Sequence, residues 1–78
     1  MEENLNLNRI KVALVERHKT SKWLAVQMEK SDTTVSRWVS NKTQPSLEQL
    51  FEIARHLNMD VKDLLNSKAY GAGNQIFQ

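Results

Sequence analysis

The sequence predicts a small all-α domain with five helices, on three observations. Apolar residues recur at spacings of three and four along several segments, which is the period of an amphipathic helix. Residues that favour the N-terminus of a helix stand directly before most of these segments. No segment shows the alternation of apolar and polar residues that is typical of a strand.

The positions of the helices follow from this periodicity and from the caps. The expected helices cover residues 5–17, 21–28, 32–40, 47–57 and 61–66. The last four each follow a suitable N-cap residue, namely Thr20, Ser31, Ser46 and Asp60. Ser46 and Gln49 also have the spacing of a capping box, in which each side chain accepts from the backbone amide of the other. The polar segment 41–45 ends in the only Pro and is expected to be a loop.

The apolar positions of these helices form the expected core. Its members are Leu7, Ile10, Ala13, Leu14, Leu24, Ala25, Met28, Val35, Trp38, Val39, Leu47, Leu50, Ile53, Ala54, Leu57, Leu64 and Leu65. Trp38 could also stack on a base of a single strand, but its place among apolar positions favours a core anchor. Trp23 has three open roles: packing in the core, covering the chain's own tail, or lying in an interface with a partner.

Length and composition limit the class of protein. A chain of 78 residues without Cys forms one small domain, with neither disulfides nor a zinc–thiolate site to stabilise it. The longest apolar run is four residues, too short for a membrane span, and no secretory signal is recognisable, so a cytoplasmic protein is expected. The domain is expected over 5–66. The tail, 67–78, is expected to be loose unless Tyr70, Ile76 and Phe77 find a surface.

The sequence shows no arrangement for catalysis or metal binding. His18 and His56 are far apart, and no second ligand stands at the spacing of a zinc site. There is no Ser-His-Asp set, no glycine-rich phosphate loop and no carboxylate pair in an apolar setting. We therefore expect neither an enzyme nor a cofactor.

Positive charge is concentrated in the first half of the chain. Residues 9–44 hold eight basic and three acidic side chains, a net charge of +5, whereas residues 45–78 carry a net charge of −1. This asymmetry is typical of a small domain with one face toward a polyanion. A solvated, lysine-rich surface is the alternative interpretation.

Four blocks of sequence point to a specific family. They read TSKWLA at 20–25, SDTTVSRW at 31–38, PSLEQL at 45–50 and IARHL at 53–57. In their order and spacing they closely resemble the lambda repressor and Cro family of helix-turn-helix domains, over about residues 8–65. The resemblance implies a five-helix, lambda repressor-like fold in which the second and third helices form the helix-turn-helix.

The sequence departs from this family's pattern at positions that matter for the structure. Glycines that are usual at helix ends and in the turn are replaced by His18, Glu29, Asn41 and Asn58. Asn tolerates a left-handed backbone more easily than Glu, which predicts slight strain at Glu29. The family often has a buried Arg–Glu ion pair between helices one and three, where this chain has Leu14 and Val39. We expect these two apolar side chains to touch.

By this resemblance, the exposed face of the third helix reads DNA bases. Its residues are Asp32, Thr33, Thr34, Ser36 and Arg37. Arg37 is suited to a bidentate contact with guanine, and Thr33 to a base edge or a thymine methyl. Asp32 can accept from a cytosine amino group, orient Arg37, or simply favour the positive end of the helix dipole.

Other residues are expected to hold phosphates without reading sequence. They are Ser21, Lys22, Asn41, Lys42 and Thr43. Ser21 replaces the Gln that is usual in relatives, and its hydroxyl can serve the same role over a shorter reach. Lys30 either adds to this set or is a solvated turn residue.

The resemblance therefore implies a sequence-specific transcriptional regulator that binds double-stranded DNA in the major groove. A homodimer is expected, at least on DNA, because one recognition helix reads only a few base pairs. Val61, Leu65 and the apolar tail residues are candidates for its interface. The alternative is an antitoxin-like protein-interaction module for which DNA binding is secondary.

Overall fold

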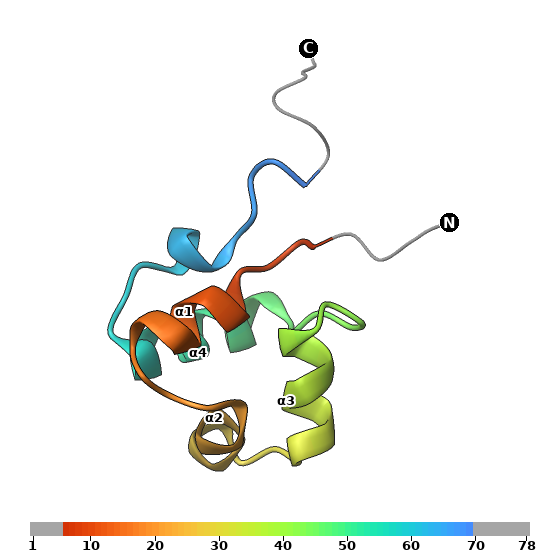
Figure 1. The fold of residues 1–78 in the computed structure, drawn as a ribbon, viewed down its shortest axis with the longest axis vertical. Helices are drawn as coiled ribbons and strands as arrows, with labels where there is room; N and C mark the ends of the chain where they lie inside the picture. Colours follow the sequence, from red (N-terminus) through yellow and green to blue (C-terminus); the bar gives the residue numbers. More distant parts are fainter. Residues whose placement is uncertain (1–5, 70–78) are drawn as a thin grey trace.

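Four α-helices and one 3-10 helix make up residues 6–69, the part of the chain that this computed structural model describes (Figure 1). They are α1 Ile10–Glu16, α2 Ser21–Met28, α3 Asp32–Val39, α4 Leu47–Leu57 and the 3-10 helix η1 Val61–Leu64. The all-α class is confirmed for these residues, but with four α-helices where the sequence predicts five. None of these helices is long and apolar enough to cross a bilayer.

Side-chain caps begin three of the four α-helices, as the sequence predicts. Thr20 and Ser31 each accept a hydrogen bond from the backbone amide three residues on, at 3.0 and 3.1 Å. Ser46 accepts from the Gln49 amide at 3.1 Å, and the Gln49 side chain accepts from the Ser46 amide at 2.8 Å. The predicted capping box is therefore complete, and it fixes the first residue of α4.

α1 is shorter than predicted because the residues before it pair with the other end of the domain. Asn8 forms an isolated antiparallel bridge with Leu65. The Asn8 side chain then accepts from the amide of Ile10 at 3.0 Å, where α1 begins. The prediction that this helix begins at residue 5 is therefore wrong, because residues 6–9 are not helical. Residue 5 itself lies outside the described residues.

The fifth expected helix is a single 3-10 turn. Asp60 caps it by accepting from the Lys62 amide at 3.0 Å, and the Asp63 amide donates to the Asp60 carbonyl at 2.9 Å. Leu65 follows with φ −104° and ψ 140°, an extended conformation that allows the bridge described above. This pairing ends the helix two residues earlier than predicted.

Every α-helix is followed by a non-glycine residue in the left-handed conformation. These residues are His18, Glu29, Asn41 and Asn58, with φ of 58°, 57°, 64° and 56°. At α2, the Lys30 amide donates to the Ala25 carbonyl at 3.0 Å and the Glu29 amide to the Val26 carbonyl at 3.2 Å, which together form a Schellman motif. The same pair of bonds closes the other three helices. The predicted left-handed turn at Glu29 is confirmed.

The core lies between all five helices. Its buried apolar residues are Ile10, Ala13, Leu14, Leu24, Ala25, Met28, Val35, Trp38, Ile53, Ala54, Leu57 and Leu64. The half-buried side chains packed against it are Trp23, Val39, Leu50, Met59 and Val61. The prediction of Trp38 as a core anchor is confirmed, and Trp23 packs at the edge of the same core.

Two residues expected in the core are exposed. Leu47 is 68% exposed because it lies at the edge of the α4 stripe, in the first turn of the helix and on the side of the exposed Phe51. Leu65 is 45% exposed because it follows η1 in an extended conformation, after the fully buried Leu64 that ends η1. Leu7 is half-buried, but it precedes α1 and is not part of its stripe.

Arg17 joins the end of α1 to the end of α4. Its Nε donates to the Leu57 carbonyl at 2.8 Å and its Nη2 to the Asn58 carbonyl at 3.3 Å. A guanidinium at this place satisfies carbonyls that lack partners within the helix and lies at the negative end of the helix dipole.

Candidate nucleic-acid interface

α2 and α3 form a helix-turn-helix. The left-handed Glu29 reverses the chain after α2, and Ser31 caps α3 two residues later. The turn between the helices is therefore three residues long, and it places the two helices together at one end of the domain (Figure 1). Val35 and Trp38 bury one face of α3 in the core, which leaves the opposite face in solvent.

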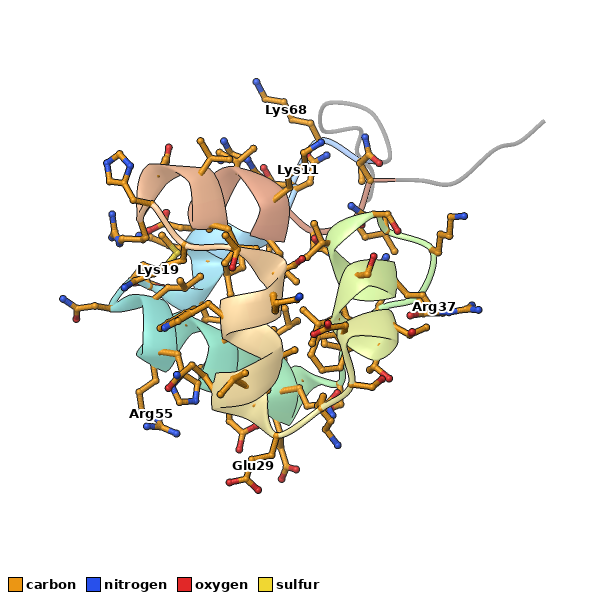
Figure 2. All side chains as sticks on the ribbon, turned by 60° about the horizontal axis from the view of Figure 1, so that its bottom comes forward. Lys11, Lys19, Glu29, Arg37, Arg55 and Lys68 are labelled. Atoms are coloured by element: carbon orange, nitrogen blue, oxygen red, sulfur yellow. The ribbon has the colours of Figure 1, made fainter. Side chains whose placement is uncertain are left out.

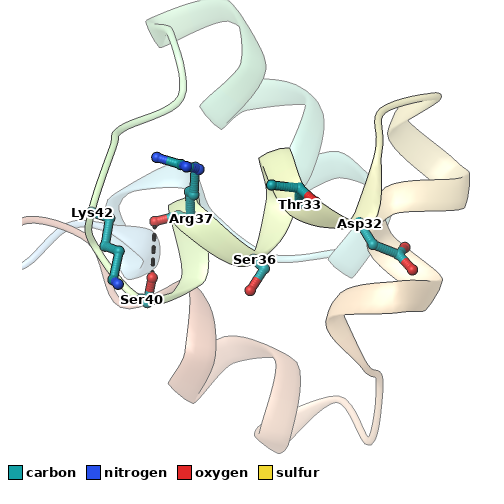
Figure 3. A pocket seen from close by; sticks show the side chains of 6 residues that line it. All are labelled: Asp32, Thr33, Ser36, Arg37, Ser40 and Lys42. Atoms are coloured by element: carbon teal, nitrogen blue, oxygen red, sulfur yellow. Dashed lines mark hydrogen bonds between the residues drawn. The ribbon is translucent and has the colours of Figure 1, made fainter.

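The exposed face of α3 borders a shallow, open hollow (Figure 3). Its lining residues are Asp32, Thr33, Ser36, Arg37, Ser40 and Lys42. Arg37 and Lys42 lie at the end where α3 stops, whereas Asp32 lies at the end where α3 begins (Figure 3). The hollow thus presents donors at one end, an acceptor at the other, and hydroxyls between them.

Four of the five residues predicted to read bases come together here. Asp32, Thr33, Ser36 and Arg37 are all exposed and line the same hollow. Thr34 does not line it: it is half-buried, and its Oγ1 accepts from the Ser31 hydroxyl at 3.0 Å. This matches its predicted place at the edge of the face.

The position of Asp32 bears on its three possible roles. It is the first residue of α3, directly after the cap, where a carboxylate interacts favourably with the helix dipole. Asp32 and Arg37 lie at opposite ends of the hollow (Figure 3). The geometry therefore does not favour a role for Asp32 in orienting Arg37.

Ser40 belongs to this surface although it is absent from the predicted set. It follows Arg37 by three residues, and its hydroxyl donates to the Arg37 carbonyl at 3.3 Å (Figure 3). The helical period could have identified Ser40 from the sequence, because residues three apart on a helix share a face. Ser40 is exposed and lines the hollow together with Lys42.

The residues predicted to hold phosphates divide into two groups. Lys22, Lys42 and Thr43 are exposed, and Ser21 is half-buried as the first residue of α2. Asn41 is different, because its side chain is buried and hydrogen-bonded within the protein. That Asn41 holds a phosphate stays a prediction, while in this structure its side chain is hydrogen-bonded to Asn8 and holds the loop that carries Lys42.

A buried polar network fixes this loop behind α3. The Asn8 Nδ2 donates to the Trp38 carbonyl at 2.9 Å and to the Gln44 Oε1 at 2.7 Å. The Gln44 Nε2 donates to the Asn41 Oδ1 at 3.0 Å. Lys42 and Thr43 are thus carried by a loop whose two flanking residues are both tied to Asn8.

Trp23 and Lys19 form a further feature at the start of α2. The Lys19 Nζ lies 4.8 Å from the centroid of the Trp23 ring, within the range of a cation–π interaction. The exposed Lys19 therefore lies over the ring of the half-buried Trp23. Among residues 6–69, no three His, Asp or Glu side chains gather as a metal site would require.

Two comparisons place the chain among known proteins. A helix-turn-helix family model matches residues 10–64. The crystal structure of a proposed DNA-binding protein from Bacteroides fragilis is 57% identical, with a TM-score of 0.76, over 77% of this chain and 97% of that one. No curated protein matches the sequence. The matched region runs from the first residue of α1 to the last of η1, and the chain belongs to the Cro/C1-type helix-turn-helix family.

Proposed function

We propose that this protein is a regulator of transcription that binds double-stranded DNA and reads its sequence with α3 in the major groove. The observation that carries the proposal is the exposed face of α3, where donors and acceptors line one open hollow on a helix anchored by Val35 and Trp38. A major groove admits one α-helix and distinguishes all four base pairs by such groups. The similar Bacteroides fragilis protein, itself described as a proposed DNA-binding protein, supports this assignment.

Each side chain on this face has a chemical role. Arg37 donates two hydrogen bonds to the O6 and N7 of guanine, the commonest specific contact in the major groove. Thr33 and Ser36 bond to base edges, and the Thr33 methyl can also contact thymine. Asp32 accepts from a cytosine amino group, in addition to its favourable place at the start of α3.

Phosphate contacts flank the base-reading face. Ser21 and Lys22 lie at the start of α2, where backbone amides and the helix dipole favour an anion. Lys42 and Thr43 lie in the loop after α3, which the Asn8 network holds. Contacts of this kind set the position of the protein on DNA, and they make its affinity dependent on salt.

We propose further that two copies bind together. One α3 covers only a few base pairs, too short a site to be selective in a genome. A two-fold dimer would present the two α3 helices about 34 Å apart to successive major grooves of a near-palindromic site. Leu65 is exposed and available for such an interface, whereas Val61 packs against the core. The other candidates, Tyr70, Ile76 and Phe77, lie outside the described residues.

Fluorescence anisotropy with the full chain tests the proposed function. The probe is a pool of random duplexes about three helical turns long, labelled and titrated across a salt series. We expect affinity to fall steeply with salt, and selection from the pool to enrich one near-palindromic motif. Binding that is equal for single strands and duplexes, or selection that enriches no motif, would overturn the proposal. Light scattering of the complex with the selected duplex then gives the number of copies bound.

A further inference from the structure

Two more shallow hollows continue the surface that α3 begins. The second lies between the N-terminal segment and the end of α3, and its lining includes Arg9, Lys11, Ser40 and Asn66. The third is lined by Arg9, Asn66 and Lys68, together with Ser67 and with Leu65, the candidate named above for the dimer interface. Ser40 is shared by the first hollow and the second, and Arg9 and Asn66 by the second and the third. The three hollows are therefore neighbours on the surface, and we refer to them together as the path.

Basic side chains follow this path along its whole length. Arg37 and Lys42 line its first part, Arg9 and Lys11 its second, and Lys68 its third. All five are exposed. The only carboxylate among the lining residues is Asp32, at the far end of the first hollow. A row of cations without interleaved carboxylates creates a positive potential along the path, which favours a polyanion.

The fold holds the second and third parts of the path in place. The Arg9 amide donates to the Leu64 carbonyl at 2.7 Å, and the Asn66 amide donates to the Leu7 carbonyl at 3.0 Å. The Asn8 side chain ties the same segment to the end of α3 through the Trp38 carbonyl. These bonds join three stretches that are far apart in the sequence, so the backbone that carries Arg9 and Lys11 is held in place relative to α3.

Exposed cations also lie outside the path, among them Lys19, Lys22 and Arg55. In Figure 2, Lys11 and Lys68 lie at the top of the molecule and Arg37 at its right, whereas Lys19 lies at the left and Arg55 and Glu29 lie at the bottom. Arg55 lines none of the three hollows. What distinguishes the path is that its five cations line hollows in which Asp32 is the one carboxylate.

We propose that Arg9, Lys11 and Lys68 form a second phosphate-binding surface, which holds the DNA backbone beyond the base pairs that α3 reads. This inference rests on the proposed function, because it extends the same interface. Its contacts carry no sequence information, and they add to affinity and to salt dependence. On this proposal, a duplex that ends at the base pairs read by α3 lacks the phosphates that this surface would hold.

The test compares two double variants on two lengths of the selected duplex. The test variant combines Arg9→Ala with Lys11→Ala, and the control combines Arg55→Ala with Lys62→Ala, an equal loss of two exposed charges outside the path. One duplex ends at the selected motif, and the other continues for about half a helical turn on each side. Anisotropy across a salt series gives affinity and salt slope, and circular dichroism checks that each variant is folded.

On the long duplex, the test variant should lose about tenfold or more in affinity, and its salt slope should fall by about two. On the short duplex it should bind like the control. Adding Lys68→Ala should lower the slope on the long duplex by about one more unit. If the test variant matches the control on both duplexes while the wild-type protein binds, this inference alone is wrong. An equal loss of affinity by the test variant on the short and the long duplex would also overturn this inference. If the wild-type protein shows no salt-dependent binding, the proposed function is overturned as well.

Discussion

The side chain of Asn41 pairs with both polar groups of the Asn8 backbone. Its Oδ1 accepts from the Asn8 amide at 2.9 Å, and its Nδ2 donates to the Asn8 carbonyl at 3.2 Å. Both residues are buried, and 33 positions of sequence separate them. The left-handed backbone of Asn41 ends α3, and the same residue thus attaches the end of the recognition helix to the N-terminal segment.

Asn8→Ala should destabilise the domain by about 1–3 kcal/mol. The substitution removes the donor to the Trp38 carbonyl and the acceptor for the Ile10 amide, which leaves polar backbone groups without their partners. Urea denaturation measures the free energy of unfolding. Gln27→Ala is the control, because Gln27 is exposed on α2 and its removal should change stability by no more than about 0.5 kcal/mol. If Asn8→Ala lowers the free energy of unfolding no more than the control does, the hydrogen-bond network makes no net contribution to stability.

Glu29→Gly should stabilise the domain by about 0.5–1 kcal/mol. A side chain in the left-handed conformation costs roughly 1–2 kcal/mol, which glycine avoids, although glycine also loses more entropy on folding. Thermal denaturation should show a rise in Tm of about 2–8 °C for a domain of this size. Asn58→Gly should raise the Tm by less, because Asn tolerates the left-handed conformation better than Glu does.

Glu29→Ala separates the backbone effect from the effect of charge. Alanine removes the carboxylate but keeps the Cβ that causes the strain, so its Tm should remain near that of the wild type. If Glu29→Ala raises the Tm as much as Glu29→Gly does, the destabilisation comes from the charge of Glu29 and not from its backbone conformation.

Local patterns predicted most of the fold. The hydroxyls of Thr20, Ser31 and Ser46 begin helices because their hydrogen bonds reach only three residues along the chain. The helix ends are also local, since each left-handed residue closes two bonds within its own turn. The exposed face of α3 followed from the burial of Val35 and Trp38, which leaves Thr33, Ser36 and Arg37 outside.

Pairing between distant segments could not be predicted in this way. The bridge between Asn8 and Leu65 joins residues at opposite ends of the domain, and a single bridge has no sequence periodicity. It shortened α1 and η1 and turned Leu65 toward solvent. The hydrogen bonds of the Asn41 side chain to Asn8 could not be predicted for the same reason, because the two residues are 33 positions apart.

Leu14→Ala should destabilise the domain by about 2–5 kcal/mol. Leu14 is 4% exposed in the core, and truncation of such a residue loses the transfer free energy of its side chain and leaves a cavity. Val15→Ala is a matched control on the same helix, because Val15 is 66% exposed. Denaturant melts that give the two variants equal stability would contradict the burial of Leu14.

Leu14 and Val39 should also be energetically coupled. Leu14 is buried and Val39 is half-buried against the same core, while their direct contact stays a prediction from the family's ion pair. Leu14→Arg alone buries a charge without a partner and should cost about 3 kcal/mol or more. Adding Val39→Glu should recover part of this loss if the two side chains meet. A double-mutant cycle with no coupling would place them apart.

Arg37→Ala and Lys42→Ala should affect DNA binding in different ways, although both residues line the same hollow. Loss of Arg37 should weaken binding to the selected duplex by about 1–3 kcal/mol and relax the base preference at one position of each half-site. Loss of Lys42 should weaken all duplexes about equally and lower the salt slope by about one unit.

Binding of both variants to the selected and scrambled duplexes, across a salt series, separates these roles. Arg55→Ala serves as the control, because it removes an exposed cation that lies on the opposite side of the molecule from Lys11 and Lys68 (Figure 2). The comparison is decisive because a base contact changes the ratio of the two affinities, whereas a phosphate contact changes both affinities and leaves their ratio constant. If Arg37→Ala leaves that ratio unchanged, Arg37 contacts phosphate, and the base-reading face of α3 must be reassigned to Thr33 and Ser36.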